Sequence, residues 1–362
     1  MKRVSWGKTG KNFRRRSVPV LVTGGAGFLG RFIAGALNDL GHPVTVLDNL
    51  SSPNSTFDCP ELADRPLECI EGSVFDAALM RGLVSCHPMI VHFATVVGVE
   101  ETISHTVPTI ENLMGTLNLV KNLTANHVVL FASSADVYGA HSRLYDRPMR
   151  ESDYFVFEHA AVNRWVYPHV KALEENLISN SAARSVVIRV FNTYGPEMDF
   201  PLPKRVVPHF LANILTESPL LLSGDGSQTR SFCHVDDMID GMIRALDYAA
   251  THPGPVAECF NLGNDAAISI RQLAEKMVAA ALDLELIPQP LPIRKDAFRY
   301  SQGFDDKWNR IPDLSHARRI LGYNPAIALD DGLRRTLQYC WRAGLKEKLC
   351  GDPAARVEAL VG

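Results

Sequence analysis

The sequence has no apolar run that approaches the ~20 residues needed to cross a bilayer, which excludes a membrane-spanning protein. It has no surplus of positive charge, since 37 Lys and Arg stand against 40 Asp and Glu, so no nucleic-acid partner is expected. Its seven cysteines are an odd number without closely spaced pairs, and neither a disulfide framework nor a metal site is predicted. These absences favour a cytoplasmic protein with reduced thiols.

The first 17 residues lack the apolar core of a secretory signal, which argues against export. They carry basic residues at Lys2, Arg3, Lys8, Lys11 and Arg14–Arg16. A basic arm of this kind can contact RNA or anionic lipid, but a disordered leader in solvent is the interpretation we favour.

The sequence does contain a strand, a glycine-rich turn and a helix, in that order. Val18–Thr23 is a short apolar run rich in β-branched residues, and Arg31–Leu40 has apolar residues at helical spacing. Between them, Gly24 permits a sharp turn, Gly27 lets the backbone approach a pyrophosphate, and Gly30 lets the helix pack closely on the sheet. Phosphates then meet a helix N-terminus, where free amide hydrogens favour negative charge.

The next apolar strand ends in an acidic residue. Val44–Asp48 is followed by Asn49, and a carboxylate at this position can accept hydrogen bonds from an adenosine ribose. The same carboxylate repels a 2′-phosphate. The sequence therefore predicts NAD rather than NADP as the bound dinucleotide.

Further apolar runs at Met89–Phe93 and Val128–Ala132 alternate with helical stretches, which is typical of a parallel sheet. We predict an α/β protein with a Rossmann-type doubly wound parallel sheet and a smaller C-terminal substrate-binding region. The predicted organisation is a disordered basic leader at 1–17, an NAD-binding domain with the catalytic residues at 18–190, a mainly substrate-binding region at 191–345 and a tail at 346–362.

A candidate base lies on a predicted helix. Residues four apart on a helix share a face, so the Lys171 ammonium can stabilise a Tyr167 phenolate. A base beside a bound dinucleotide can remove the proton of an alcohol while the carbon loses hydride. Because proline is tolerated near a first turn, Pro168 places the predicted helix start close to Trp165. Ser134, at the end of the fourth predicted strand, can share the proton of the reacting hydroxyl.

Together these residues resemble the extended short-chain dehydrogenase/reductase family, the group of nucleotide-sugar epimerases, dehydratases and decarboxylases. The resemblance covers nearly all of residues 18–345. The segments that carry it are Thr23–Gly30, His92–Ala94, Asn112 with Gly115–Asn118, Ser134, Tyr167 with Lys171, and Arg189–Pro196.

The resemblance implies a set of site residues. The cofactor residues are Gly24, Gly27, Phe28, Leu29, Gly30, Asp48, Asn49, Ser73, Val74, Phe93, Ala94, Thr95, Asn112 and Lys171. The substrate residues are Asn192, Arg205, Val206, Arg230 and Arg310, and the catalytic residues are Ser134, Asp136, Tyr167, Lys171 and Arg310. The resemblance also implies a tightly bound, recycled NAD and a homodimer that pairs through two helices, one of which carries Tyr167.

The C-terminal half resembles the decarboxylases of this group most. Gly224–Asp237 is similar to the UDP-glucuronate decarboxylase form of a motif in which Arg230 binds the nucleotide diphosphate, with Ser231 in place of an acidic residue. Gly303–Asp313 resembles UDP-apiose/xylose synthase and the bacterial aminoarabinose-pathway decarboxylase, which places Arg310 near the sugar C4 and carboxylate. A guanidinium suits a uronate carboxylate through paired hydrogen bonds.

The chain departs from these relatives in three places, which are Ser134-Ala135-Asp136, Ser73, and Pro168 with Val170 inside the segment from Tyr167 to Lys171. The decarboxylases usually read Thr-Ser-Glu where this chain has Ser134-Ala135-Asp136. A 4,6-dehydratase would usually have an Asp in place of Ala135 as general acid, whereas C4 epimerisation tolerates alanine. Ser73 stands where an Asp usually contacts adenine.

The expected chemistry starts at the sugar C4. Tyr167, assisted by Ser134 and Lys171, deprotonates the C4 hydroxyl, and C4 becomes a ketone. Decarboxylation of UDP-glucuronate is the first hypothesis, 4-epimerisation of a UDP-hexose or UDP-hexuronate is the alternative, and 4,6-dehydration is less favoured. The alternative from another class is a non-catalytic NAD-binding protein. The choice among UDP, dTDP and GDP stays open.

Overall fold

The structure is a computed structural model that describes residues 17–52, 54–63, 65–95, 106–158, 163–196, 198, 205–296 and 309–346. Nearly all of the predicted basic leader and tail therefore lie outside the described residues, as does the stretch 303–308 that contributed to the resemblance.

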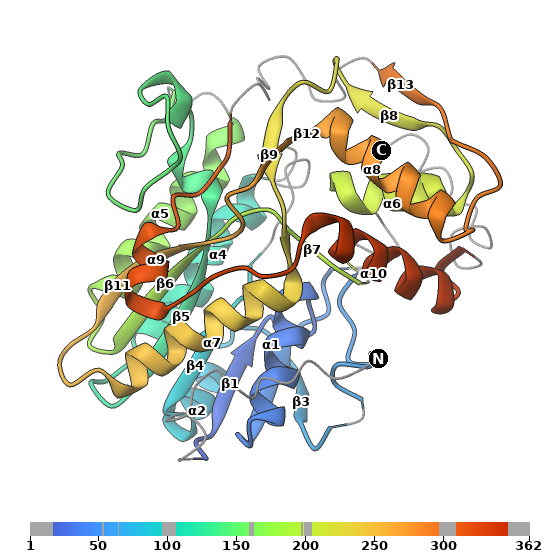
Figure 1. The fold of residues 1–362 in the computed structure, drawn as a ribbon. Helices are drawn as coiled ribbons and strands as arrows, with labels where there is room; N and C mark the ends of the chain where they lie inside the picture. Colours follow the sequence, from blue (N-terminus) through green and yellow to red (C-terminus); the bar gives the residue numbers. More distant parts are fainter. Residues whose placement is uncertain are drawn as a thin grey trace.

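A seven-stranded parallel sheet forms the centre of the molecule (Figure 1). Its order is β11-β6-β5-β4-β1-β2-β3. The strands are β1 (Val20–Thr23), β2 (Val44–Asp48), β3 (Glu68–Glu71), β4 (Met89–His92), β5 (Val128–Ser134), β6 (Arg184–Val190) and β11 (Ala257–Leu262). The order reverses between β1 and β4, which makes this the switch point where a doubly wound sheet binds ligands. The predicted fold class and the four predicted strands are confirmed, with ends shifted by one or two residues.

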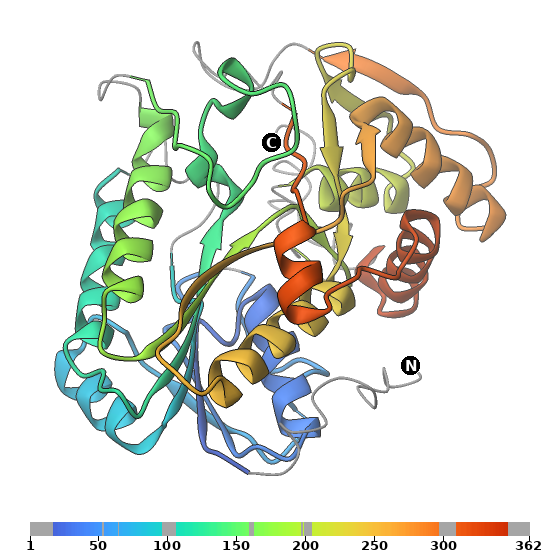
Figure 2. The same ribbon diagram turned by 60° about the vertical axis from the view of Figure 1, so that its left-hand side comes forward.

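Helices cover both faces of the sheet because successive strand residues point to opposite sides. Val20 and Val22 pack in the core on the side of α1 (Phe28–Asp39) and α7 (Val235–Thr251). Leu21 packs in the other core layer, on the side of α2 (Ala77–Cys86), α4 (Thr106–Val120) and α5 (Val166–Ser179). Figure 2 shows α4 and α5 side by side on that second face.

A second apolar core supports the C-terminal part. It is built from α6 (Val206–Leu215), β8 (Leu220–Ser223), α8 (Ile270–Asp283), β13 (Ile293–Asp296) and α10 (Leu329–Arg342). Three two-stranded sheets complete this part: β7 (Thr193–Tyr194) with β10 (Cys233–His234), β9 (Thr229–Ser231) with β12 (Ala267–Ser269), and β8 with β13. α9 (Ser315–Leu321) packs near α7, and β11 joins the large sheet although it follows residue 190 in the chain.

Two local predictions concern helix starts. α5 begins at Val166 with Trp165 as its N-cap, as predicted, and Pro168 occupies the third helical position. A proline there leaves intact every backbone hydrogen bond of the helix interior. α1 begins at Phe28, three residues before the predicted Arg31. No helix among the described residues is long and apolar enough to cross a lipid bilayer.

Candidate active site

The glycine turn links β1 to α1 in a tight geometry. Gly24 has a φ of +67°, a conformation that residues with a side chain rarely adopt. A Cβ on Gly30 would overlap the Gly24 carbonyl oxygen. The helix can approach the strand this closely because glycine has no Cβ. At Gly27, by contrast, the nearest atom to an added Cβ is 3.4 Å away. The outer side of the turn therefore leaves room for a pyrophosphate at the N-terminus of α1.

Asp48, at the end of β2, faces this turn. Its Oδ2 accepts the Ala26 N–H at 3.0 Å and its Oδ1 accepts the Leu50 N–H at 2.9 Å. Burial raises the pKa of Asp48, and the backbone hydrogen bonds oppose that rise. Each carboxylate oxygen can accept a second bond, so ribose hydroxyls can be accommodated. Asn49 accepts the Ser51 N–H.

The remaining predicted cofactor residues lie along the same edge of the sheet. Phe93, Ala94 and Thr95 directly follow β4, and Ser73 and Val74 follow β3. Ser73 accepts the Phe75 N–H, and Asn112 is buried on α4. All of these groups sit at the carboxyl ends of parallel strands or on the helices beside them, where a doubly wound sheet binds dinucleotides. The residues present fit NAD.

Lys171 is held firmly on the inner face of α5. Its side chain is 2% exposed, and its Nζ donates to the Ala132 carbonyl oxygen at 3.2 Å. The same nitrogen lies 3.0 Å from Glu174 Oε2 and 6.0 Å from the centre of the Tyr167 ring. The ammonium is therefore placed between the end of β5 and the phenol.

Tyr167 is half-buried, and its phenol forms a hydrogen bond with the Ser134 side chain. Burial raises the pKa of Tyr167 above its usual range, and the charges of Asp136 and Glu174 raise it further. The nearby Arg205 cation and the Ser134 hydroxyl lower it. In the protein without bound ligands, the phenol is thus protonated at neutral pH, and additional positive charge is needed to make it a base.

Asp136 and Arg310 meet beside these groups. The Ser134 Oγ donates to Asp136 Oδ2 at 3.2 Å, within a 3₁₀ turn, η2 (Ala135–Tyr138), and Arg310 forms an ion pair with Asp136 Oδ1. Burial raises the pKa of Asp136, but the charges of Arg310 and Arg164 outweigh this, and the pKa falls below its usual range. Arg164 lies in a second 3₁₀ turn, η4 (Asn163–Trp165).

The predicted substrate residues come from four segments. Asn192 lies between β6 and β7 and donates to the Ser231 carbonyl oxygen at 3.2 Å. Arg230 is buried in β9 and forms a parallel bridge with Arg310, which brings these two guanidinium-bearing segments together. Arg205 occupies the N-cap position of α6, without a capping hydrogen bond from its side chain, and Val206 is the first residue of the helix.

Sequence reasoning missed a buried polar network behind the site. Arg189, in β6, forms a two-point ion pair with Glu175 at 2.9 and 3.1 Å and donates to the Tyr138 hydroxyl at 2.9 Å. Tyr138 in turn donates to Asn261 at 2.7 Å. Glu174, which is completely buried, was also missed. The available signal was a pair of acidic residues three and four positions after Lys171, a spacing that puts them on the helix face that carries the catalytic candidates.

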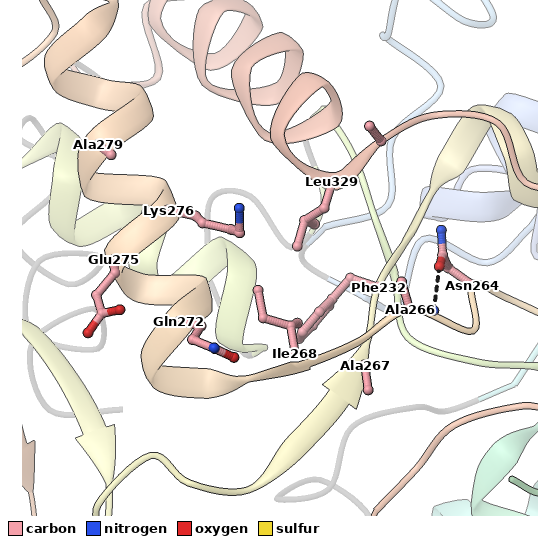
Figure 3. A pocket seen from close by; sticks show the side chains of 11 residues that line it. Phe232, Asn264, Ala266, Ala267, Ile268, Gln272, Glu275, Lys276, Ala279 and Leu329 are labelled. Atoms are coloured by element: carbon pink, nitrogen blue, oxygen red, sulfur yellow. Dashed lines mark hydrogen bonds between the residues drawn. The ribbon is translucent and has the colours of Figure 1, made fainter.

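A separate cavity of about 690 Å³ opens between α8 and the N-terminal end of α10 (Figure 3). Phe232, Ile268 and Leu329 form its apolar part, and Gln272 and Lys276 add polar groups. None of the predicted site residues in the described part of the chain lines it. This cavity is therefore distinct from the cluster around Tyr167.

Comparison with known proteins agrees with this geometry. The profile of the NAD dependent epimerase/dehydratase family matches residues 20–263. The UDP-N-acetyl-alpha-D-glucosaminuronate decarboxylase of Bacillus cytotoxicus is 32% identical over 324 residues, which cover 88% of this chain and 96% of the relative. UDP-glucuronic acid decarboxylase 4 of Arabidopsis thaliana is 32% identical, with coverages of 90% and 69%. The structure of a UDP-glucose 4-epimerase of Thermotoga maritima with UDP-glucose is 25% identical, has a TM-score of 0.74 and covers 90% and 99%.

Proposed function

Because the chain belongs to the NAD dependent epimerase/dehydratase family, and is an NAD-dependent nucleotide-sugar enzyme, we propose that it decarboxylates a UDP-hexuronate. The two decarboxylase relatives support this reaction class, and their names support UDP as the nucleotide. UDP-glucuronate and UDP-N-acetylglucosaminuronate are the two candidate substrates.

The position of Arg310 carries the proposal. Its guanidinium reaches the cluster of Ser134, Asp136 and Tyr167, where it is paired with the Asp136 carboxylate. A guanidinium pairs readily with a planar carboxylate, and a hexuronate presents such a group on C5. A substrate whose sugar lacked the carboxylate would offer Arg310 no second carboxylate to pair with.

The cofactor residues would hold NAD along the carboxyl edge of the sheet. The turn at Gly24 and Gly27 would receive the pyrophosphate, Asp48 the adenosine ribose, and Lys171 the nicotinamide ribose. When bound, NAD supplies the acceptor and later the donor of the C4 hydride. Tyr167 would then face two positive charges, the Lys171 ammonium and the nicotinamide ring, and its pKa would fall towards neutrality.

The residues of this chain would then act in two stages. Tyr167, with its proton shared by Ser134, removes the proton of the C4 hydroxyl as C4 becomes a ketone. The product is a β-keto acid, whose C5–carboxylate bond breaks to release carbon dioxide, and the electron pair becomes an enolate. Arg310 and Ser134 stabilise the developing negative charge. A proton from water would add to C5, the hydride would return to C4, and Tyr167 would return its proton to the C4 oxygen, which gives a UDP-pentose.

A second candidate is 4-epimerisation, favoured by one specific observation. Ala135 and Asp136 leave this site with one hydroxyl fewer and a shorter carboxylate than the decarboxylases usually have. Epimerisation needs only that C4 is oxidised and then reduced on the opposite face. Mass spectrometry of the products from both UDP-hexuronates separates the two reactions, because decarboxylation removes the mass of carbon dioxide and epimerisation leaves the mass unchanged.

We also propose that two copies of the chain pair through α4 and α5. These adjacent helices expose Val107, Ile110 and Met114 on α4 and Leu173 on α5, each at least 48% accessible. Covering these side chains removes apolar surface from water. The interface would lie on the face of α5 that points away from Lys171.

A further inference from the structure

A completely buried carboxylate lies next to the catalytic lysine. Glu174 is 0% exposed, and its Oε1 accepts the Thr116 hydroxyl at 2.6 Å. Its Oε2 lies 3.0 Å from Lys171 Nζ but has no aligned hydrogen bond among the described residues. The carboxylate therefore depends on the Lys171 charge, because a buried ion without a counter-charge is strongly disfavoured.

Among the described residues, the hydrogen-bonded chain that leads from Glu174 through Thr116 contains no cation. The Thr116 hydroxyl lies 3.3 Å from His92 Nε2, and His92 Nδ1 lies 2.7 Å from the Thr23 hydroxyl. Burial lowers the pKa of His92 to about 4, so this imidazole is neutral at physiological pH. The network therefore runs from β1 through β4 and α4 to Glu174 without adding positive charge.

Lys171 consequently serves two partners on one face of α5. Tyr167, Lys171 and Glu174 are spaced by four and three residues, and such positions stack along a helix. Among the described residues, charged and titratable groups of the packed elements lie near this row. They are Asp136 of η2, Arg164 of η4, His92 of β4, Arg205 at the start of α6, and Arg189 of β6, which is paired with Glu175 of α5 itself. The hydroxyls of Thr116 on α4 and Ser134 on β5 also face it.

We propose that Glu174 is a positioning residue that holds the Lys171 ammonium and sets the pH at which Tyr167 becomes a base. The inference rests on the proposed role of Tyr167. A negative charge beyond Lys171 offsets part of the field that the ammonium exerts on the phenol, and Glu174 accordingly raises the pKa of Tyr167. The enzyme thus works at a higher pH than Tyr167 and Lys171 alone would dictate.

The expected change in the pKa of Tyr167 follows from the spacing of Tyr167 and Glu174 along the helix. Seven residues correspond to a rise of about 10 Å. At that separation and an effective dielectric constant of about 20, removing one charge changes the phenol pKa by about one unit. Glu174→Gln should therefore lower the pKa of Tyr167 by about one unit, while Glu174→Asp, which keeps the charge, should move it by much less.

The test is a titration of the NAD-loaded protein followed by the ultraviolet absorbance of tyrosinate. Subtracting the titration of the matching Tyr167→Phe protein isolates Tyr167 from the other eight tyrosines among the nine of the chain. Thermal unfolding followed by circular dichroism checks that each variant is folded. If Glu174→Gln does not fold, Glu174→Met, which is neutral and similar in volume, takes its place.

A downward shift in the neutral variant, with little change in Glu174→Asp, supports the inference. An unchanged or raised pKa, or equal shifts in both variants, overturns it. The acid limb of the pH profile of kcat/KM provides the same pKa from turnover and should move in parallel. Because the absorbance titration needs no substrate, it still tests Glu174 if UDP-hexuronates are not converted, and the two proposals fail separately.

Discussion

Asp136 and Arg310 form an ion pair that joins the turn after β5 to the segment before α9. The other oxygen of the Asp136 carboxylate accepts a hydrogen bond from the Ser134 hydroxyl. A substrate carboxylate that binds Arg310 must therefore share it with Asp136 or displace it. This relationship makes Arg310 the residue on which substrate charge should depend most.

Arg310→Ala should weaken binding of uronates and not of nucleotides. The lost pair of charge-assisted hydrogen bonds corresponds to about 2 kcal/mol, or a rise in KM of about 30-fold for the UDP-hexuronate. The Kd for UDP, measured by calorimetry, should change little. Arg310→Lys is the matched variant and should recover only part of the affinity, because an ammonium cannot pair in two-point fashion. If UDP and the UDP-hexuronate lost equal affinity, Arg310 would contact the diphosphate and not the sugar carboxylate.

Tyr167→Phe should abolish turnover while NAD stays bound. The variant removes the general base without removing the ring, and a loss of about 10²–10⁴-fold in kcat is expected. Turnover is measured by product formation and bound NAD by absorbance after denaturing release. A loss of less than about tenfold in kcat would mean that another group is the base.

Asp48→Asn should weaken NAD binding and reduce its preference over NADP. The amide keeps the volume of the side chain but loses the charge that repels a 2′-phosphate. Calorimetry with each dinucleotide on the cofactor-free protein should give a fall in NAD affinity of about tenfold, the equivalent of one charge-assisted bond. An unchanged ratio of the affinities for NAD and NADP would mean that Asp48 does not contact the adenosine ribose.

Asp153 should make stability depend on pH in acid. Burial raises its pKa, but bonds from Arg147, Arg150 and His141 outweigh this and lower it to about 2. The folded pKa lies below the unfolded value, so the stabilisation is present above pH ~4 and is lost as pH falls towards 2. Asp153→Asn should lower the free energy of unfolding by about 2 kcal/mol at pH 7. Urea unfolding at both pH values measures this, with Asp146→Asn on the exposed surface as control. A difference that persists at pH 2 would refute the charge argument.

Met114→Glu with Leu173→Glu should convert a dimer into a monomer, because each places a charge in the apolar surface of α4 and α5. Sedimentation velocity measures the change. Ile320→Glu is the control, since Ile320 is also exposed but lies on α9. A wild-type protein that sediments as a monomer, or a dimer that tolerates both changes, contradicts the proposed interface.

The sequence predicted four strands from their local signal, but β6, which is also a buried apolar run, was not predicted. β1, β2, β4 and β5 are buried apolar runs, and they were found. β3 was not, because Glu68–Glu71 is an edge strand with exposed side chains and has no apolar run. The helix start at Trp165 could be predicted because proline restricts the backbone on its own.

The site was less predictable where it depends on distant contacts. A glutamate within a helix is normally taken as a solvent-facing residue. Glu174 is buried because the Thr116 hydroxyl donates to its carboxylate and the Lys171 ammonium pairs with it. In the same way, the partner of Arg189 is visible only when β6 lies beside α5. The motif residues themselves could be named from the sequence because their spacing fits one known arrangement.

The most direct test of the central claim uses UDP-glucuronate, and in parallel UDP-N-acetylglucosaminuronate, carrying deuterium at C4. If C4 is oxidised and reduced within one turnover, the product of one of these substrates should have lost carbon dioxide and kept the deuterium at C4, since the same hydride leaves and returns. Mass spectrometry with fragment analysis reads both. A product that has lost the deuterium, or one that keeps the carboxylate, would contradict the account.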